Sequence, residues 1–131
     1  MTARRRLAVA SLALWTLALF LPCVEGATDY WGGTGLSGIL LSLWASLLLW
    51  GLLPLLTNLP VLWAALELRS GPTLTDEGRW NVAFLSAMFS CGSLVMFWGF
   101  FDWGAFVWLA SVALAVASLL VGEREPRRVR A

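Results

Sequence analysis

The chain alternates long apolar stretches with short polar segments. Residues 7–21, 36–68, 82–101 and 104–121 contain only one charged side chain between them. An apolar α-helix needs about 20 residues to cross the roughly 30 Å hydrocarbon core of a bilayer. The pattern therefore predicts an all-α membrane protein, a single domain over residues 1–131 with four transmembrane helices.

The first stretch, residues 7–21, is short for a span, because fifteen residues rise about 22 Å as a helix. It follows an arginine triplet at 4–6 and ends before Pro22. The helix can begin earlier if the arginine side chains extend to the membrane surface, which predicts a span over about 5–22.

Two alternatives compete with an uncleaved first helix. A basic start, a short apolar stretch and small residues before Gly26 also suit a signal peptide cleaved after that glycine. The Leu-Pro-Cys sequence ending at Cys23 resembles a lipoprotein acceptor, but the residue before the cysteine is Pro22 where a small residue is required. We favour the uncleaved helix.

The second stretch, residues 36–68, is too long for one straight span, since its helix would reach about 50 Å. Arg69 supplies a charged boundary, and counting back from it predicts a span over 48–68. Residues 36–47 then form an interfacial or re-entrant helix on the outer side. The rival division places the span at 37–56.

Pro54, Asn58 and Pro60 fall inside the preferred second span. Each proline removes a backbone donor and clashes with a carbonyl one turn back, so we expect a kink. Asn58 can donate a hydrogen bond to a carbonyl freed by that kink. These three residues are the candidate polar site.

The second half of the chain predicts a helical hairpin. Thr75 is placed to cap a helix start, with acidic residues in the first turn. Spans follow at 82–101 and 104–121, and the turn between them is so short that the two helices must be antiparallel neighbours.

Charge predicts the topology. Acids alone occupy two of the connecting segments, whereas all nine arginines lie in the other segments, at Arg4, Arg5, Arg6, Arg69, Arg79, Arg124, Arg127, Arg128 and Arg130. Because cytoplasmic segments carry the excess of basic residues, both termini are expected in the cytoplasm. Anionic lipid headgroups account for this basic face, and we expect no nucleic-acid partner.

The composition excludes several kinds of catalytic and metal site. The chain is 60% apolar and 13% charged and contains no histidine, so the usual near-neutral base and the commonest metal ligand are missing. We expect no catalytic residues, no metal and no cofactor. Glu67, the charged residue nearest a span, is expected to be a carboxylate reaching for water at the membrane boundary; the alternative is a proton-coupling site.

Small residues recur at four-residue spacing on the last two spans. Ala83, Ala87 and Cys91 share one stripe, and Ser111 and Ala115 share another. Such stripes let helices approach closely in lipid. We expect them to pack the third and fourth helices together; the alternative is that one stripe docks a partner or a second copy.

Three short motifs carry a resemblance: Leu19-Phe20-Leu21-Pro22, Asn58-Leu59-Pro60 and Trp108-Leu109-Ala110-Ser111. With four hydrophobic segments and a Gly/Trp-rich external stretch, the chain resembles small uncharacterised bacterial four-helix inner-membrane proteins. In those proteins the Asn and Pro are adjacent, whereas Leu59 separates them here. The resemblance implies a location in the bacterial inner membrane and carries no activity.

Two functions remain. The leading hypothesis is a non-catalytic accessory or scaffold subunit of a larger membrane assembly, whose partners are the lipid bilayer and other membrane subunits or further copies of the chain. It is favoured by the small-residue stripes and by nine Trp and seven Phe. The alternative is a small oligomeric transporter or channel with its pathway near Asn58. An enzyme acting on lipids ranks below both, because no acid–base pair is present.

Overall fold

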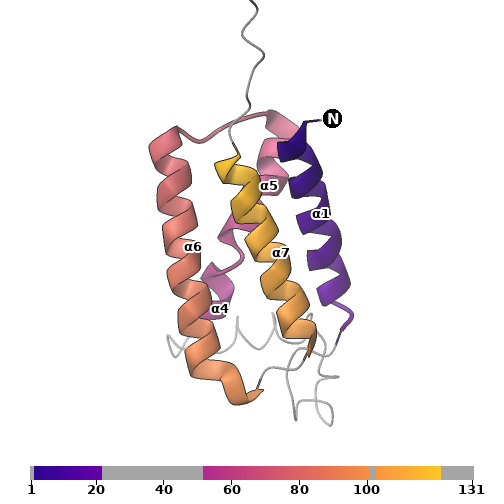
Figure 1. Ribbon diagram of the computed structural model, residues 1–131, viewed down its shortest axis with the longest axis vertical. Helices are drawn as coiled ribbons and strands as arrows, with labels where there is room; N and C mark the ends of the chain where they lie inside the picture. Colours follow the sequence, from indigo (N-terminus) through magenta and orange to yellow (C-terminus); the bar gives the residue numbers. More distant parts are fainter. Residues whose placement is uncertain (1, 22–51, 101–102, 122–131) are drawn as a thin grey trace, which may run out of the picture.

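The computed structural model describes residues 2–21, 52–100 and 103–121, and all regular structure within them is helical. The elements are α1 (Ala3–Ala18), α4 (Leu52–Leu56), α5 (Leu59–Ser70), α6 (Asp76–Phe97), the 3₁₀ turn η2 (Trp98–Phe100) and α7 (Trp103–Leu120). Because α5 continues the course of α4, these elements form four rods that stand side by side (Figure 1). The all-α prediction is confirmed. The predicted outer helix at 36–47 lies outside the described residues.

Two of the rods are long and apolar enough to cross a membrane, by length and composition, within the described residues. They are Leu52–Ser70 and Trp103–Leu120. The first agrees with the division that placed the second span at 48–68. Of the other two rods, α1 has 16 residues and includes the arginine triplet, and α6 begins with charged residues. Membrane crossing by all four rods remains a prediction.

Local signals explain where the rods begin and end. Thr2 Oγ1 accepts the Arg5 N–H at 3.4 Å at the start of α1, and Thr75 Oγ1 accepts the Gly78 N–H at 3.1 Å at the start of α6. The predicted Thr75 cap is thus confirmed. At its other end α1 stops at Ala18, short of the predicted residue 22, and the N–H groups of Phe20 and Leu21 donate to carbonyls three residues back.

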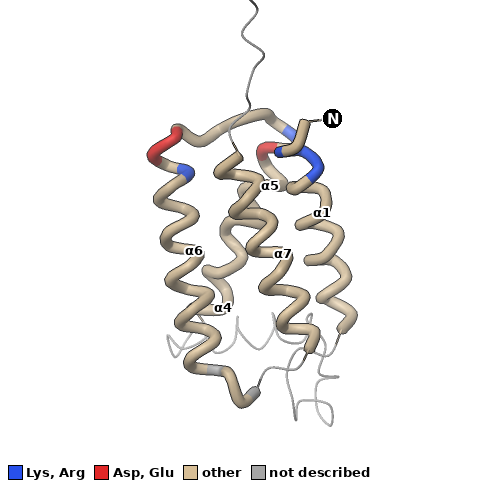
Figure 2. Tube along the Cα trace, in the orientation of Figure 1, with Lys and Arg blue, Asp and Glu red and all other residues tan. Residues whose placement is uncertain are grey.

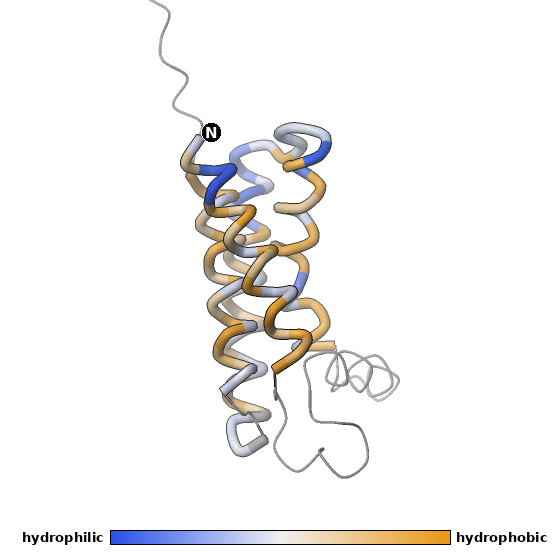
Figure 3. The backbone as a smooth tube through the Cα atoms, turned by 90° about the vertical axis from the view of Figure 1, so that its right-hand side faces the viewer, coloured by the Kyte–Doolittle hydropathy of each residue, from blue (hydrophilic) through white to orange (hydrophobic). Residues whose placement is uncertain are grey.

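The charged residues of the described ranges lie at one end of the bundle (Figure 2). The antiparallel arrangement brings together the first turn of α1, the last turn of α5 and the first turn of α6. The rest of the described bundle is tan in Figure 2 and mainly hydrophobic in Figure 3. The arginine-bearing segments in these ranges therefore share one end, as the charge pattern predicts.

The core lies between α1, α5 and α7. Its buried cluster consists of Ala8, Val61, Ala64, Val112 and Ala115. Small side chains let the helix backbones approach closely, and α7 makes its most extensive contacts with α1. The small stripe of α7 was expected to face α6. That expectation is wrong, because Ala115 belongs to the cluster shared with α1 and α5.

A hydrogen bond joins the same two helices. Ser11 Oγ on α1 donates to the carbonyl oxygen of Ser111 on α7 at 2.8 Å, and both residues are fully buried. The backbones must therefore lie close enough for a short side chain to bridge them. The Ser111 carbonyl thus faces α1, while the Ser111 hydroxyl donates within α7 to the Trp108 carbonyl at 2.6 Å.

Enlarging a side chain at this contact tests the packing. Ala115 has no exposed surface, whereas Ala113 on the same helix is exposed. Ala115→Leu is expected to lower the free energy of unfolding by about 2 kcal/mol or more, because the added carbons have no space between α7 and its neighbours. Ala113→Leu is expected to change it by less than about 0.5 kcal/mol. Unfolding in mixed detergent, followed by circular dichroism, measures both; equal effects would contradict the described packing.

Candidate functional site at Asn58

The rod formed by α4 and α5 is interrupted at Thr57 and Asn58. The Asn58 N–H donates to the Leu55 carbonyl at 3.1 Å, three residues back, so the Pro54 carbonyl loses the backbone donor that a continuous helix would give it. Pro60 lies in the first turn of α5, where a missing N–H costs little. The expected kink is thus a two-residue break.

The Asn58 side chain compensates for this break. Its Nδ2 donates to the Pro54 carbonyl at 3.1 Å, and a longer contact of 3.5 Å reaches the Leu55 carbonyl. The prediction that Asn58 binds a freed carbonyl is confirmed. A polar side chain in an apolar rod is thereby satisfied by its own backbone.

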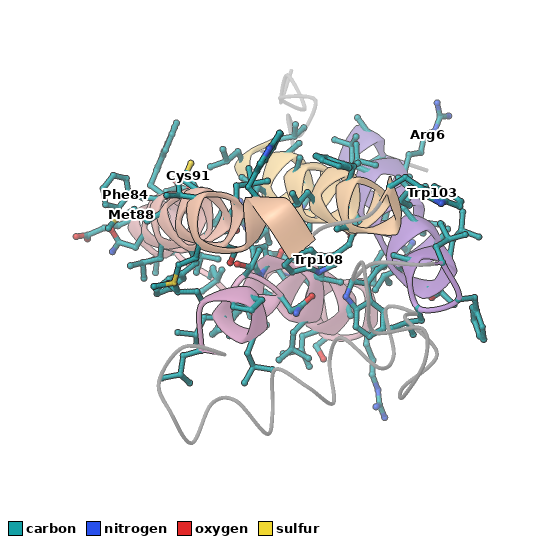
Figure 4. The ribbon with its side chains drawn as sticks, turned by 90° about the horizontal axis from the view of Figure 1, so that it is seen from below. Arg6, Phe84, Met88, Cys91, Trp103 and Trp108 are labelled. Atoms are coloured by element: carbon teal, nitrogen blue, oxygen red, sulfur yellow. The ribbon has the colours of Figure 1, made fainter. Side chains whose placement is uncertain are left out.

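The amide oxygen of the same residue links two other helices. Trp15 Nε1 on α1 donates to Asn58 Oδ1 at 2.9 Å, and Trp108 Nε1 on α7 donates to it at 2.7 Å. Both indoles are partly buried against the core cluster. Figure 4 shows Trp108 among the helices. We call Asn58, Trp15, Trp108 and the Pro54 carbonyl the Asn58 junction.

The two tryptophans were not found from the sequence. A buried indole N–H usually finds an acceptor, so an amide within an apolar stretch was a possible signal. However, Trp15 and Trp108 are 43 and 50 residues from Asn58 along the chain. The packing of α1 and α7 on the break brings these two indoles to Asn58.

The junction is neutral and joins α1, the α4–α5 break and α7. An amide and two indoles do not titrate near neutral pH, so the junction offers neither a general acid nor a general base. Both polar ends of the amide already have partners within the chain. The arrangement is suited to holding helices in register.

A second polar contact lies at the charged end of the bundle. Arg4 of α1 forms an ion pair with Glu67 of α5, with 9% and 5% of their side-chain surfaces exposed. Glu67 Oε1 also accepts the backbone N–H groups of Thr73 at 3.0 Å and Leu74 at 3.3 Å. The expectation that Glu67 reaches for water is therefore wrong. The carboxylate joins α1 to the loop that follows α5.

The small stripe of α6 does not pack as a unit within the chain. Ala83 is 7% exposed, but Ala87 and Cys91 are exposed, and the buried side chains beside Ala83 are Ser86 and Ser93. At about 100° per residue, Cys91 lies about 80° from Ala83 in one direction and Ser93 about 80° in the other. The bundle covers the serine side. For Ala87 and Cys91, packing against the fourth helix is thus contradicted.

Among the described residues, no group of three or more His, Cys, Asp or Glu side chains could hold a metal ion. Comparison with family models, curated proteins and solved structures finds no match to this chain. The resemblance to bacterial four-helix inner-membrane proteins remains a prediction.

Proposed function

We propose that this protein is a non-catalytic accessory or scaffold subunit of a larger assembly in a bacterial inner membrane. All four rods cross the bilayer in this proposal, and both termini lie in the cytoplasm. The outer surface of α6 contacts a transmembrane helix of another subunit.

The Asn58 junction carries this proposal. Its hydrogen bonds link three separate parts of the chain, and the oxygen and nitrogen of the Asn58 amide are both already engaged. Interhelical hydrogen bonds of this kind hold membrane helices in a fixed arrangement. A fixed bundle suits a subunit whose role is to present a surface.

The outer surface of α6 supports the choice of docking face. Ala87 and Cys91 are exposed beside Phe84 and Met88, which are 66% and 54% exposed (Figure 4). Small residues flanked by large ones let a second membrane helix approach closely while the large side chains pack around it.

Cross-linking from Cys91 tests this proposal in native membranes. A photoactivatable cross-linker is attached to Cys91 in a Cys23→Ser background, in cells of the organism that encodes the protein. We expect one defined product with a different polypeptide, identified by mass spectrometry. The matched control places the only cysteine at Val9, which is 47% exposed on α1, in the background Cys23→Ser, Cys91→Ala, and should give no such product.

Three outcomes contradict the proposal. If Cys91 gives no cross-linked protein product, the outer surface of α6 is not a docking face. The same product from the cysteine at Val9 shows random collision. A product of two identical chains, together with solute flux in proteoliposomes that Asn58→Leu abolishes, favours the oligomeric transporter instead.

A further inference from the structure

A cleft of about 320 Å³ opens at the charged end of the bundle, between the start of α1 and the end of α5. We propose that this cleft binds the phosphate group of an anionic phospholipid. The inference relies on the membrane location in the proposed function, but not on the presence of a partner subunit.

The charges around the cleft favour an anion. Arg4, Arg5 and Arg69 line it, together with one acid, Glu67. That carboxylate is already engaged, by Arg4 and by the two backbone N–H groups of the following loop. Arg5 and Arg69 are exposed, and neither forms an ion pair with another described residue. Two guanidinium groups thus remain for a ligand.

The geometry of α1 adds further donors. Thr2 and the first turn of α1 line the cleft; Thr2 Oγ1 accepts the Arg5 N–H, and the N–H groups before Arg5 have no partner within the helix. Together with the helix dipole, they attract phosphate groups. Arginine forks match phosphate oxygens with paired hydrogen bonds, so both kinds of donor favour the same ligand.

The remaining walls favour a lipid over a free anion. Leu68 and Pro72 line the cleft beside the arginines, and Ala8 and Ala64 form its buried apolar part. A glycerol backbone and the first acyl carbons can pack on such walls, whereas a small hydrated anion gains nothing from them. Basic pockets between membrane helices on the cytoplasmic side bind anionic headgroups in this manner.

Native mass spectrometry of the full chain in mild detergent tests the proposal, with phosphatidylglycerol titrated against phosphatidylcholine. We expect phosphatidylglycerol to bind as one tightly held molecule. Arg5→Gln combined with Arg69→Gln should weaken that binding about tenfold or more, since two charge-assisted contacts are lost. The matched control combines Arg6→Gln with Arg79→Gln. It removes the same charge from the same end but from outside the cleft, and should have less than about a twofold effect.

Comparing the two double variants distinguishes a specific lipid-binding site from general attraction by a basic surface. Equal loss in both double variants would show general attraction of anions, and equal retention of phosphatidylcholine would show no headgroup preference; either result overturns the proposal. Displacement of the lipid by millimolar glycerol phosphate would assign the cleft to a soluble ligand and also overturn it. None of these outcomes depends on the partner cross-linked through Cys91.

Discussion

Asn58→Leu is expected to lower the free energy of unfolding by about 2 kcal/mol. The change leaves the indole N–H groups of Trp15 and Trp108 without their acceptor and the Pro54 carbonyl without its donor. An unsatisfied buried donor costs about 1–3 kcal/mol, and interhelical bonds in membranes lie near the lower end of that range. Unfolding in mixed detergent, followed by tryptophan fluorescence and circular dichroism, measures the loss.

The control for this variant removes the donors as well. Trp15→Phe and Trp108→Phe, combined with Asn58→Leu, replace the indoles and the amide with apolar groups, so no indole donor is left without an acceptor. Because removing both partners costs less than removing one, the triple variant should be less destabilised than the three single effects added together. Strict additivity would show that these residues do not interact.

Glu67→Ala is expected to be at least as damaging, with a loss of about 3 kcal/mol. It removes the Glu67 carboxylate from the buried Arg4 guanidinium and releases the N–H groups of Thr73 and Leu74. Removing one member of a buried ion pair costs about 3–5 kcal/mol, and the lower value applies at the end of a bundle near water. The same unfolding assay measures it.

Two further variants test whether the loss of stability comes from the ion pair between Arg4 and Glu67. Arg4→Met breaks the pair but keeps the bonds from Glu67 to the loop, so its effect should be smaller than that of Glu67→Ala. Arg6→Met, at an exposed position on the same helix, should change stability by less than about 0.5 kcal/mol. If Arg6→Met and Arg4→Met lower the stability equally, the general positive charge at this end stabilises the protein, and the ion pair of Arg4 with Glu67 does not.

The sequence predicted the helices well because their signals are local. Apolar runs, the Thr75 cap and the prolines each act within a few residues, and the structure starts α6 after Thr75 and breaks the second rod before Pro60 as these signals indicate. The helix ends were predicted less well, since α1 ends at Ala18 and α6 at Phe97 where the sequence predicted 22 and 101. The bond from Asn58 to a freed carbonyl is equally local, with donor and acceptor four residues apart.

The sequence correctly predicted α6 and α7 as neighbours, but it could not predict which helix the small residues of α7 pack against. Ser111 and Ala115 have the small side chains needed for close contact, but that pattern does not distinguish α1 from α6 as the partner. The burial of Glu67 has the same origin, since its counterion comes from Arg4 at the far end of the sequence. On α6, four-residue spacing suggested one face, while the exact rotation of the helix exposes Ala87 and Cys91.

The most direct test of the Asn58 junction is hydrogen–deuterium exchange of the tryptophan indole N–H groups, observed by NMR on the full chain in detergent. Trp80, which is 66% exposed, provides the fast reference. We predict that the Trp15 and Trp108 signals exchange much more slowly than that of Trp80, and that Asn58→Leu accelerates both together. Exchange of both signals at the Trp80 rate in the unaltered protein, or slow exchange that Asn58→Leu leaves unchanged, would contradict the junction.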